Sequence, residues 1–407
     1  MAPSHADVLV VGGGPAGLRA AEVAAAHGAA VTLWDAQPSV GRKFLVAGRG
    51  GLNLTHGEPV ENFPRRYGSE EDRWRDLLQE FGPDALRQWA AELSIDTYVG
   101  TSGRVFPRGQ KAAVLLRAWT TRLRAAGVEF RMGARIVGMS RNADAWQIQL
   151  AAEEGAFSAR AQAVVLALGG ASWPDTGSDG TWPIPLKAHG VEVTSWMPAN
   201  CGWNVDWPEE VLRRAEGLPL KNLTVTAGDE SVSGELLITR YGLEGGAIYR
   251  LGPLLRAMQE PRIEIDLKPQ LTTEALRDRL AQHPGLDQWQ RTLKLSPAAV
   301  ALLDSFYRAD CGDAGKLIAR VKNFTLPLRS PRPIEEAISS AGGIAWSELD
   351  SSLMLRKLPG IFAAGEMIDW EAPTGGYLLQ GCFSTGTRAG QSAAKWAAGR
   401  SRQAVAQ

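Results

Sequence analysis

The chain has 407 residues, with 44 Lys and Arg against 44 Asp and Glu, so its formal net charge is zero. Hydrophobic residues make up 44% of the chain, which allows a sizeable core. The balanced charge predicts no nucleic-acid partner, and the lack of any stretch of ~18 apolar residues predicts no membrane span. The segment "MAPSHADVLVVGGG" lacks the pattern of a secretory signal, so we expect a cytoplasmic protein.

The cysteines and histidines are too scattered to predict a metal site. Cys201, Cys311 and Cys382 are far apart, and no CxxC pattern occurs. This spacing disfavours both a redox-active dithiol and a thiolate metal centre. We therefore expect no metal.

The first 35 residues predict a strand, a helix and a second strand. Residues 6–11 form a short apolar run typical of a buried parallel strand. An alanine-rich helix is expected from Pro15 to about residue 27, with Gly28 placed to end it. Residues 29–34 form the second strand, and an aspartate stands at its carboxyl end.

A G-x-G-x-x-G pattern joins the first strand to the helix. In such a turn the first glycine makes the bend, the second lets the backbone approach a pyrophosphate, and the third lets helix and strand pack closely. The helix N-terminus favours phosphate, and Asp35 stands where a ribose hydroxyl is bound. An ordinary glycine-rich turn would not explain this aspartate. We expect a dinucleotide to contact Gly12, Gly14, Pro15, Ala16, Gly17 and Asp35.

The middle of the chain changes character several times. Residues 70–126 read as mainly helical, with amphipathic stretches such as "KAAVLLRAWTTRLRAAG". Strand-like segments then predict a meander that leads into a buried strand over residues 163–168. Residues 194–268 alternate between apolar and polar residues and predict antiparallel strands. Residues 270–320 read as helices, one of them capped by Ser296 before a proline.

The C-terminal part returns to the first pattern. Residues 360–369 form a buried strand that ends in an acidic residue, and a long helix is expected over residues 376–399. The dinucleotide fold therefore starts at the N-terminus, is interrupted from about residue 194 to about residue 330, and is completed afterwards. Because only one G-x-G-x-x-G pattern is present, we expect no second dinucleotide domain.

Six short motifs along the whole chain resemble those of a flavoprotein family, the HI0933-like group, which includes BaiN-type NAD(P)/FAD-dependent oxidoreductases. They are "VVGGGPAGLRAA", "GRKFLVAGRGGLNLTH", "GRVFP", "LALGGASWPDTGSDG", "ITRYGLEGGA" and "GIFAAGEMIDWEAPTGGYLLQGCFSTGTRAG". This chain departs from the family pattern at two places. Many members carry G-G-G-R-C-N where this chain has G-R-G-G-L-N, so Gly51 and Leu52 stand at the arginine and cysteine positions before Asn53. Arg240 stands where a histidine is frequent.

The resemblance implies an α/β fold. A Rossmann-like FAD-binding core of the glutathione-reductase type would be interrupted by an inserted antiparallel, barrel-like β domain with a small helical insertion. We expect the core over residues 1–193 and 336–407, the β domain over 194–269 and 321–335, and the helical insertion over 270–320.

The resemblance also assigns the glycine-rich loop that follows Asp35. It would run along the FAD diphosphate and ribityl chain to the flavin ring, with Arg42 and Lys43 towards the phosphates or the adenosine side and Asn53 nearer the ring. A solvated basic surface loop is the alternative. The loop residues expected to contact FAD are Gly41, Arg42, Lys43, Gly48, Gly51, Leu52 and Asn53.

Further cofactor contacts are expected outside this loop. Ile136 can present backbone groups to adenine, although a plain strand residue is the alternative. Glu366 can accept a ribityl hydroxyl or act only as a structural cap. The full set is Ile136, Gly169, Gly170, Gly365, Glu366, Gly376, Tyr377 and Leu379.

The resemblance predicts an FAD-dependent oxidoreductase in which reduced flavin gives hydride to an activated carbon–carbon double bond of a small apolar substrate. NAD(P)H would be a transient co-substrate. Arg240 and Tyr241 are the predicted catalytic residues, in a site between the core and the inserted domain. The alternatives are a flavin monooxygenase, a tRNA-modifying flavoprotein and a non-catalytic FAD-binding protein; the sequence leaves the oligomeric state open.

Overall fold

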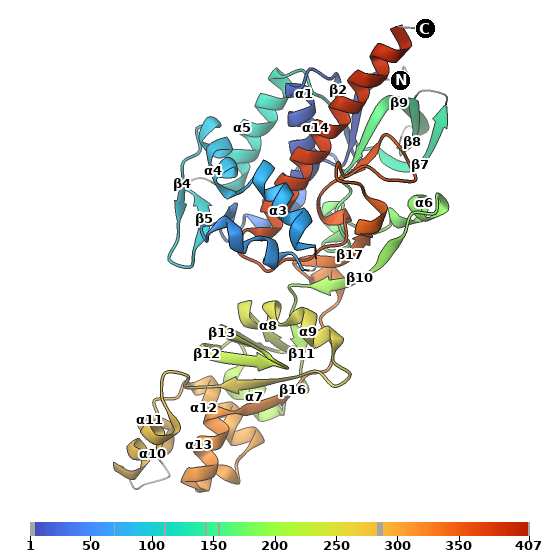
Figure 1. Cartoon of the computed structure of the whole chain (residues 1–407). Helices are drawn as coiled ribbons and strands as arrows, with labels where there is room; N and C mark the ends of the chain where they lie inside the picture. Colours follow the sequence, from blue (N-terminus) through green and yellow to red (C-terminus); the bar gives the residue numbers. More distant parts are fainter. Residues whose placement is uncertain are drawn as a thin grey trace. The chain divides into compact units, whose positions relative to one another are not determined.

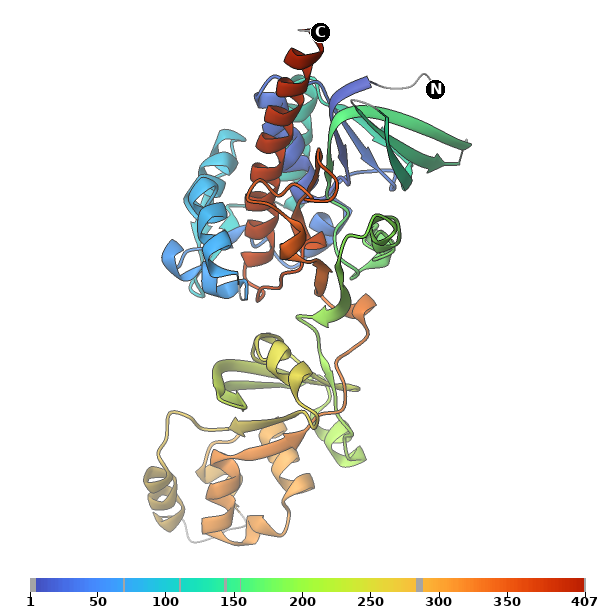
Figure 2. The ribbon, with the colours of Figure 1, turned by 45° about the vertical axis from the view of Figure 1, so that its right-hand side comes forward.

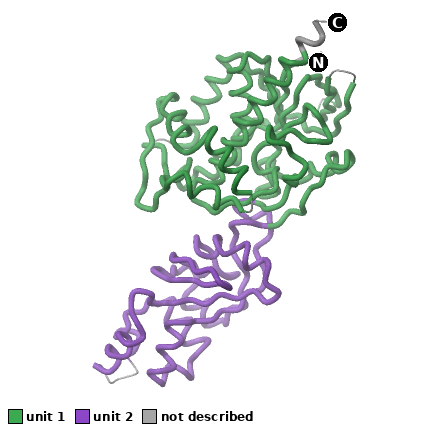
Figure 3. The backbone as a smooth tube through the Cα atoms, in the orientation of Figure 1, with its two compact units in different colours: residues 1–197, 340–407 green, residues 198–339 purple. Residues whose placement is uncertain are grey.

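The computed structural model divides the chain into two compact units (Figure 3). Unit 1 contains Met1–Met197 and Ser340–Gln407, and unit 2 contains Pro198–Ser339. The sequence-based expectation for the inserted segment is residues 194–335. The structure describes residues 5–68, 70–109, 111–142, 145–153, 155–282 and 288–405.

A parallel sheet forms the centre of unit 1. The strand β1 lies between β2 and β9, β6 extends the sheet beyond β2, and β18 pairs with β9. Val8 and Val10 of β1 are fully buried, as expected for an apolar strand covered on both faces. The predicted strands near residues 6, 29 and 360 are confirmed. The bounds are β1 (His5–Val11), β2 (Val31–Asp35), β6 (Glu129–Met132), β9 (Gly155–Leu166) and β18 (Ile361–Ala363).

An antiparallel meander continues the same sheet. β7 (Arg135–Asn142) pairs with β8 (Ala145–Ala152), and β8 pairs with the first half of β9. The second half of β9 pairs with β18. The last meander strand and the buried strand predicted from the sequence are therefore a single strand of 12 residues.

A layer of helices packs together in unit 1 (Figures 1 and 2). α1 (Pro15–Ala26) and the long α14 (Tyr377–Val405) lie side by side, with α5 (Ala112–Ala125) beside them. The two backbones come close because α14 carries glycine at the contacts. A Cβ at Gly386 would lie 2.5 Å from the Ala16 carbonyl oxygen, and one at Gly390 would lie 2.4 Å from that of Ala20.

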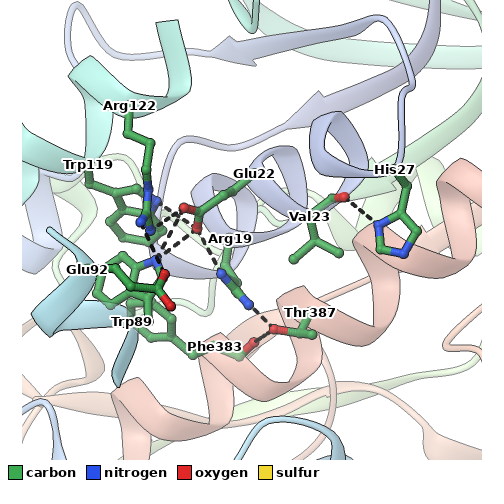
Figure 4. A network of polar contacts seen from close by, with 10 residues as sticks. All are labelled: Arg19, Glu22, Val23, His27, Trp89, Glu92, Trp119, Arg122, Phe383 and Thr387. Atoms are coloured by element: carbon green, nitrogen blue, oxygen red, sulfur yellow. Dashed lines mark hydrogen bonds and ion pairs between the residues drawn. The ribbon is translucent and has the colours of Figure 1, made fainter. Parts of the chain in front are cut away.

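A largely buried carboxylate on α1 holds this helix to its neighbours (Figure 4). Glu22 accepts hydrogen bonds from the indole nitrogens of Trp89 at 3.0 Å and Trp119 at 3.1 Å. It also pairs with Arg19 at 2.9 Å and with Arg122 at 2.5 Å. The Glu22 side chain is only 13% exposed, so these partners satisfy a charge that is largely removed from water.

The region between β2 and α5 contains elements that the sequence analysis missed. Residues 70–126 are not helical throughout, because the hairpin of β4 (Thr97–Val99) and β5 (Arg104–Pro107) separates two helices from α5. Glycines turn this hairpin, with Gly103 at φ 77°. β3 (Thr55–His56) pairs with β5. The helices before the hairpin are α3 (Glu71–Glu80) and α4 (Pro83–Glu92).

The glycine-rich loop after Asp35 holds a short helix, where the sequence indicated neither helix nor strand. α2 (Arg42–Ala47) follows Gly41, which has a left-handed conformation at φ 70°, and ends at Gly48. Phe44 is buried and anchors this turn. The apolar pattern over 6 residues is too short to reveal a helix by its periodicity.

Unit 2 is built on an antiparallel sheet of order β11-β14-β13-β12-β15-β16. Its two ends are linked, since the Asn204 amide donates to the Ser330 carbonyl at 2.8 Å and Arg329 donates back at 2.9 Å. This linkage gives the barrel-like closure that was expected. The strands are β11 (Trp203–Asn204), β12 (Pro219–Ala227), β13 (Glu230–Thr239), β14 (Gly242–Glu244), β15 (Arg262–Asp266) and β16 (Phe324–Pro327).

Helices pack within unit 2, and some lie where only strands were expected. α7, α8 and α9 interrupt the region 194–268, whereas the helices after residue 270 confirm the prediction. Ser296 caps α12, since its hydroxyl accepts from the Ala299 amide at 3.2 Å. The bounds are α7 (Glu209–Ala215), α8 (Gly246–Arg250), α9 (Gly252–Ala257), α10 (Thr273–Gln282), α11 (Trp289–Thr292), α12 (Pro297–Phe306) and α13 (Ala314–Lys322).

Two further strands carry the chain into and out of unit 2. β10 (Val193–Ala199) and β17 (Ser339–Ile344) form a two-stranded sheet. α6 (Pro183–Ala188) precedes β10. In the described parts of the chain, no helix combines the length and the apolar character that a membrane span requires.

Candidate cofactor site

A cavity of about 380 Å³ lies at the carboxyl ends of β1, β2, β9 and β18. In open sheets of parallel strands, ligands bind in the crevice at this edge, and the volume is within the usual range of small-molecule sites. The sequence-predicted residues that line it are Gly12, Gly14, Pro15, Ala16, Asp35, Gly41, Arg42, Lys43, Ile136, Gly169, Gly365 and Glu366.

The three glycines of the first turn have different surroundings. Gly12 has φ 109°, and a Cβ there would lie 2.1 Å from the Ala167 carbonyl oxygen. A Cβ at Gly17 would lie 1.8 Å from the Gly12 carbonyl oxygen. A Cβ at Gly14 would meet no atom within 4 Å. The fold itself therefore needs Gly12 and Gly17, whereas no neighbouring atom requires glycine at Gly14, and the open space there can accommodate a ligand.

Asp35 is held rigidly at the edge of this open space. Its carboxylate accepts from the Gly13 amide at 2.6 Å and from the Gln37 amide at 2.7 Å. Burial raises the pKa of Asp35, although these two hydrogen bonds act in the opposite direction. The two backbone donors orient the side chain, and its remaining lone pairs can accept from a ribose hydroxyl.

Arg42 and Lys43 differ in what they offer a phosphate. The Lys43 ammonium lies 2.8 Å from the Glu366 carboxylate and 2.8 Å from the Ser172 hydroxyl. Arg42 has a buried Nε without a hydrogen-bond partner among the residues that the structure describes. A buried charged donor of this kind is costly unless a ligand satisfies it. Arg42 is therefore the better candidate for a phosphate contact.

Glu366 is engaged on both oxygens. One pairs with Lys43, and the other accepts from the Ser340 amide at 3.0 Å. Gly170 packs against the same serine, since a Cβ there would lie 1.9 Å from the Ser340 hydroxyl. Gly170 supports the wall of the cavity, whereas its neighbour Gly169 lines the cavity directly.

The remaining predicted cofactor residues do not line the cavity. They are Gly17, Gly48, Gly51, Leu52, Asn53, Gly170, Gly376, Tyr377 and Leu379. Gly376 lies close to the end of the glycine-rich loop, because it has φ 106° and a Cβ there would lie 2.3 Å from the Thr55 carbonyl oxygen. Asn53, two residues before Thr55, has a buried Oδ1 with no partner in the described part of the chain.

A polar cluster surrounds Tyr377 at the start of α14. The Tyr377 hydroxyl donates to Glu58 at 2.6 Å, and its carbonyl accepts from the Tyr67 hydroxyl at 2.8 Å. Arg66 pairs with Glu58 at 2.6 Å. Burial raises the pKa of Glu58, but the hydrogen bonds from Arg66 and Tyr377 outweigh it, so the net pKa is lowered. No sequence pattern indicated this cluster, because Tyr377 is 310 residues away from Tyr67 and 319 residues away from Glu58 along the chain.

Parts of the cavity wall lie outside the predicted set of cofactor contacts. Arg135 pairs with Asp179 at 2.6 Å, and the Trp182 indole donates to the Gly169 carbonyl at 2.8 Å. Cys382 of α14 lines the cavity, and burial raises the pKa of its thiol to about 12. This thiol stays protonated at neutral pH, as expected for a small core residue rather than a nucleophile.

The predicted catalytic pair lies elsewhere, in unit 2, between β13 and β14. Arg240 is exposed, and Tyr241 is half-buried with its hydroxyl donating to Glu244. Burial and this carboxylate raise the pKa of Tyr241. The Arg332 guanidinium lies 4.1 Å from the centre of the Tyr241 ring. Neither predicted residue lines the cavity in unit 1, so a catalytic role for them stays a prediction.

Across the described ranges, nowhere do three or more His, Cys, Asp or Glu side chains meet in a way that could hold a metal ion.

A family model and two curated relatives match almost the whole chain. The model of the HI0933-like protein Rossmann domain matches residues 6–392. A 3-dehydro-bile acid delta(4,6)-reductase of Clostridium scindens is 27% identical over 95% of this chain and 98% of its own. A ribosomal RNA dihydrouridine synthase of Escherichia coli is 23% identical over 93% of this chain and 96% of its own.

Solved structures share the fold at low identity. A 3-ketosteroid-delta4-(5alpha)-dehydrogenase of Rhodococcus jostii superposes with a TM-score of 0.55 at 16% identity, covering 96% of this chain and 97% of its own. A flavocytochrome c3 fumarate reductase superposes with a TM-score of 0.51 at 18% identity, covering 97% and 79%. With a family model that matches nearly the whole length, the chain belongs to the HI0933-like family.

Proposed function

We propose that this protein is an FAD-dependent oxidoreductase that uses NAD(P)H to reduce an activated carbon–carbon double bond. The observation that carries the proposal is the open space at Gly14, flanked by the buried Nε of Arg42 and by the rigid carboxylate of Asp35. In one cavity, Gly14 would let a phosphate approach the backbone, Arg42 would donate to that phosphate, and Asp35 would accept from a ribose hydroxyl. Bound FAD would supply the hydride chemistry.

The chain's own residues would hold the cofactor at two places. The α1 N-terminus, Arg42 and Asp35 would bind the diphosphate and ribose, because these groups line one cavity. Asn53 and Gly376 would lie towards the ring, since the unpartnered Oδ1 of Asn53 is an unused acceptor. The α14 helix links the two places, because Leu378 and Leu379 stand on the same helical face as the cavity residue Cys382.

The names of the relatives support a reaction class better than a substrate. One name describes a reductase of double bonds in a 3-dehydro-bile acid, and the other describes formation of dihydrouridine in ribosomal RNA. Both reactions saturate a carbon–carbon double bond in a molecule that also carries a ring carbonyl. We therefore propose hydride addition to such a bond, with a steroid-like enone as the first candidate substrate and uridine in RNA as the second.

Anaerobic titration tests this function. NADH and NADPH are added separately to the FAD-loaded protein, and the flavin absorbance is followed. The reduced protein is then mixed with a 3-oxo-4,6-diene steroid or with ribosomal RNA. We expect one nicotinamide to reduce the flavin and one substrate to reoxidise it without oxygen. If neither donor reduces the flavin, the oxidoreductase proposal fails; a hydroxylated product in air would indicate a monooxygenase.

Arg42→Ala should weaken FAD binding. If the guanidinium donates to a phosphate, its loss costs about 1–3 kcal/mol, which corresponds to roughly 5- to 150-fold in the dissociation constant. Arg49→Ala is the matched control, because Arg49 is exposed and does not line the cavity. Isothermal titration calorimetry of both apoproteins with FAD measures the two dissociation constants. Equal FAD affinities for the two variants would mean that Arg42 makes no phosphate contact and that the loop is a basic surface loop.

Leu378→Asp should lower the midpoint potential of the bound flavin. Reduction adds negative charge, which a helix N-terminus favours by about 0.3–2 kcal/mol, and a carboxylate in the first turn of α14 would compete for that field. The expected drop is roughly 10–40 mV for a two-electron couple. Leu378→Asn is the neutral control of the same shape. An unchanged potential in FAD-saturated Leu378→Asp would show that α14 does not point at the ring.

A further inference from the structure

We propose that unit 1 binds single-stranded RNA on a surface formed by the loop after α2, the β4–β5 hairpin and the start of α5. This basic face consists of Arg49, Arg104, Arg108, Lys111 and Arg117, with Tyr98 as a stacking platform for a base. The inference rests on the RNA arm of the proposed function and adds the surface that would hold such a substrate.

The zero net charge of the chain conceals two stretches without acidic residues. Residues 36–57 contain three Lys and Arg but no Asp or Glu, and residues 97–128 contain six Lys and Arg but no Asp or Glu. The rest of the chain carries the balancing acidic residues. Summing charge over the whole chain therefore misses a local excess of the kind that attracts phosphates.

The fold brings these two stretches together. β3 pairs with β5, with His56 opposite Arg104. A Cβ at Gly48 would lie 2.4 Å from the Cβ of Ala112, the first residue of α5. Because residues 41–56 contact both the hairpin and α5, their positive charges lie on adjoining elements rather than on opposite sides of the unit.

The charges of the basic face are not neutralised within the chain. In the described ranges, none of its five members has a carboxylate within 4.0 Å, and all except the half-buried Arg104 are exposed. Arg122, on the same helix α5, contrasts with them, because it pairs with Glu22 and Glu92. Asp96 lies next to Arg108, because the Arg108 backbone amide donates to the Asp96 carbonyl at 2.7 Å, but in the described chain the two side chains form no ion pair.

An exposed aromatic residue stands among these cations. Tyr98 is 41% exposed, the Arg108 guanidinium lies 5.4 Å from its ring centre, and Phe106 stacks behind it at 5.7 Å. Proteins that bind single-stranded nucleic acid combine a cationic groove for the backbone with aromatic rings on which bases stack. A free phosphate would need only the cations, so the aromatic ring favours a nucleic acid strand.

The basic face also reaches the segment predicted to lie at the flavin ring. A Cβ at Gly375 would lie 3.5 Å from the Arg104 Nε. Gly375 precedes Gly376 and Tyr377, which the sequence analysis assigned to the cofactor. A strand held on the basic face would therefore bring its bases close to the reactive end of the site.

Fluorescence anisotropy of a labelled uridine-rich RNA oligonucleotide tests the proposal, with the FAD-loaded full chain at several salt concentrations. The variant replaces Arg49, Arg108, Lys111 and Arg117 with Ala. The control replaces four exposed cations of unit 2 with Ala, which changes the net charge equally: Lys221, Arg277, Arg308 and Lys316. For single strands the slope of log affinity against log salt is about −0.7 per phosphate contact, so the face variant should lose a slope of roughly 3 units.

We expect the face variant to bind RNA at least tenfold more weakly while the control variant binds as the parent does. Tyr98→Ala should lower the affinity without changing the salt slope, because stacking releases no counterions. Equal losses in the two quadruple variants, or no RNA binding by the parent chain, would overturn the proposal. So would preferential binding to phosphatidylserine vesicles, or a raised KM for NADPH in the face variant with unchanged RNA affinity.

The same preparations separate this inference from the proposed function. FAD content and reduction by NAD(P)H are measured on each variant before RNA is added. A chain that binds RNA through the basic face but never retains FAD would contradict the reductase and leave the face intact. A chain that reduces a steroid enone but ignores RNA would contradict the face alone.

Discussion

Gly14→Val should give a folded chain that does not retain FAD. A Cβ at Gly14 meets no atom within 4 Å, so the larger side chain fits without disturbing β1 or α1. The backbone of Gly14 is already extended, at φ −75° and ψ 179°, a conformation that valine adopts readily. The new methyl groups would occupy the cavity where a pyrophosphate has to approach the α1 N-terminus. We expect FAD affinity to fall by about 100-fold or more, which corresponds to about 2.7 kcal/mol.

The matched control is Gly246→Val. Gly246 is also at the start of a helix with open space at its Cβ, but it lies in unit 2. Both variants should show the same circular dichroism as the parent, and only Gly14→Val should be purified without yellow colour. Gly17→Val is expected to fail differently, by misfolding, because its Cβ would clash with the Gly12 carbonyl. Retention of FAD by a folded Gly14→Val variant would show that the pyrophosphate does not bind at Gly14.

Glu22→Ala should cause the largest loss of stability among single substitutions in the α1 layer. The change leaves two buried indole N–H groups without an acceptor, removes the carboxylate partner of Arg19 and leaves Arg122 with the exposed Glu92 alone (Figure 4). Breaking a buried pair by removing one partner costs about 3–5 kcal/mol. Since Arg122 is 30% exposed, we expect a loss near the lower end, about 3 kcal/mol of the free energy of unfolding.

Urea unfolding of two controls isolates the buried carboxylate. Glu92→Ala removes an exposed partner of Arg122 at 3.5 Å, with a side chain that is 56% exposed, and should cost less than about 1 kcal/mol. Glu22→Gln keeps an oxygen that can accept from one indole, so its free energy of unfolding should lie between those of Glu22→Ala and Glu92→Ala. Equal stabilities for Glu22→Ala and Glu92→Ala would mean that the network adds nothing beyond surface pairing.

The nucleotide end of the candidate site was predictable because its chemistry is local in sequence. Gly12, Gly14, Gly17 and Asp35 stand within a single strand–helix–strand unit, so their spacing alone predicts a common edge of the sheet. The helix from Pro15 and the long C-terminal helix also follow from alanine-rich composition and from capping glycines. Local propensity and tertiary packing agree in these elements.

The rest of the site depends on contacts that no local pattern encodes. The pairing of Lys43 with Glu366 joins residues 323 positions apart, and it changes which cation is free to meet a phosphate. The hairpin of β4 and β5 is only three and four residues per strand, too short for its alternation to compete with the helical pattern around it. The basic face was hidden for a related reason, because a net charge is summed over both units.

The most direct test of the account is the chromophore of the protein as purified. We expect a flavin absorption spectrum, release of an equimolar amount of FAD on denaturation, and anaerobic bleaching by NADH or NADPH. The released chromophore is identified as FAD rather than FMN by its chromatographic retention. A colourless chain that takes up no added FAD, or one that binds FAD only as well as Gly14→Val does, would contradict the central claim that the cavity at Gly14 is a flavin site.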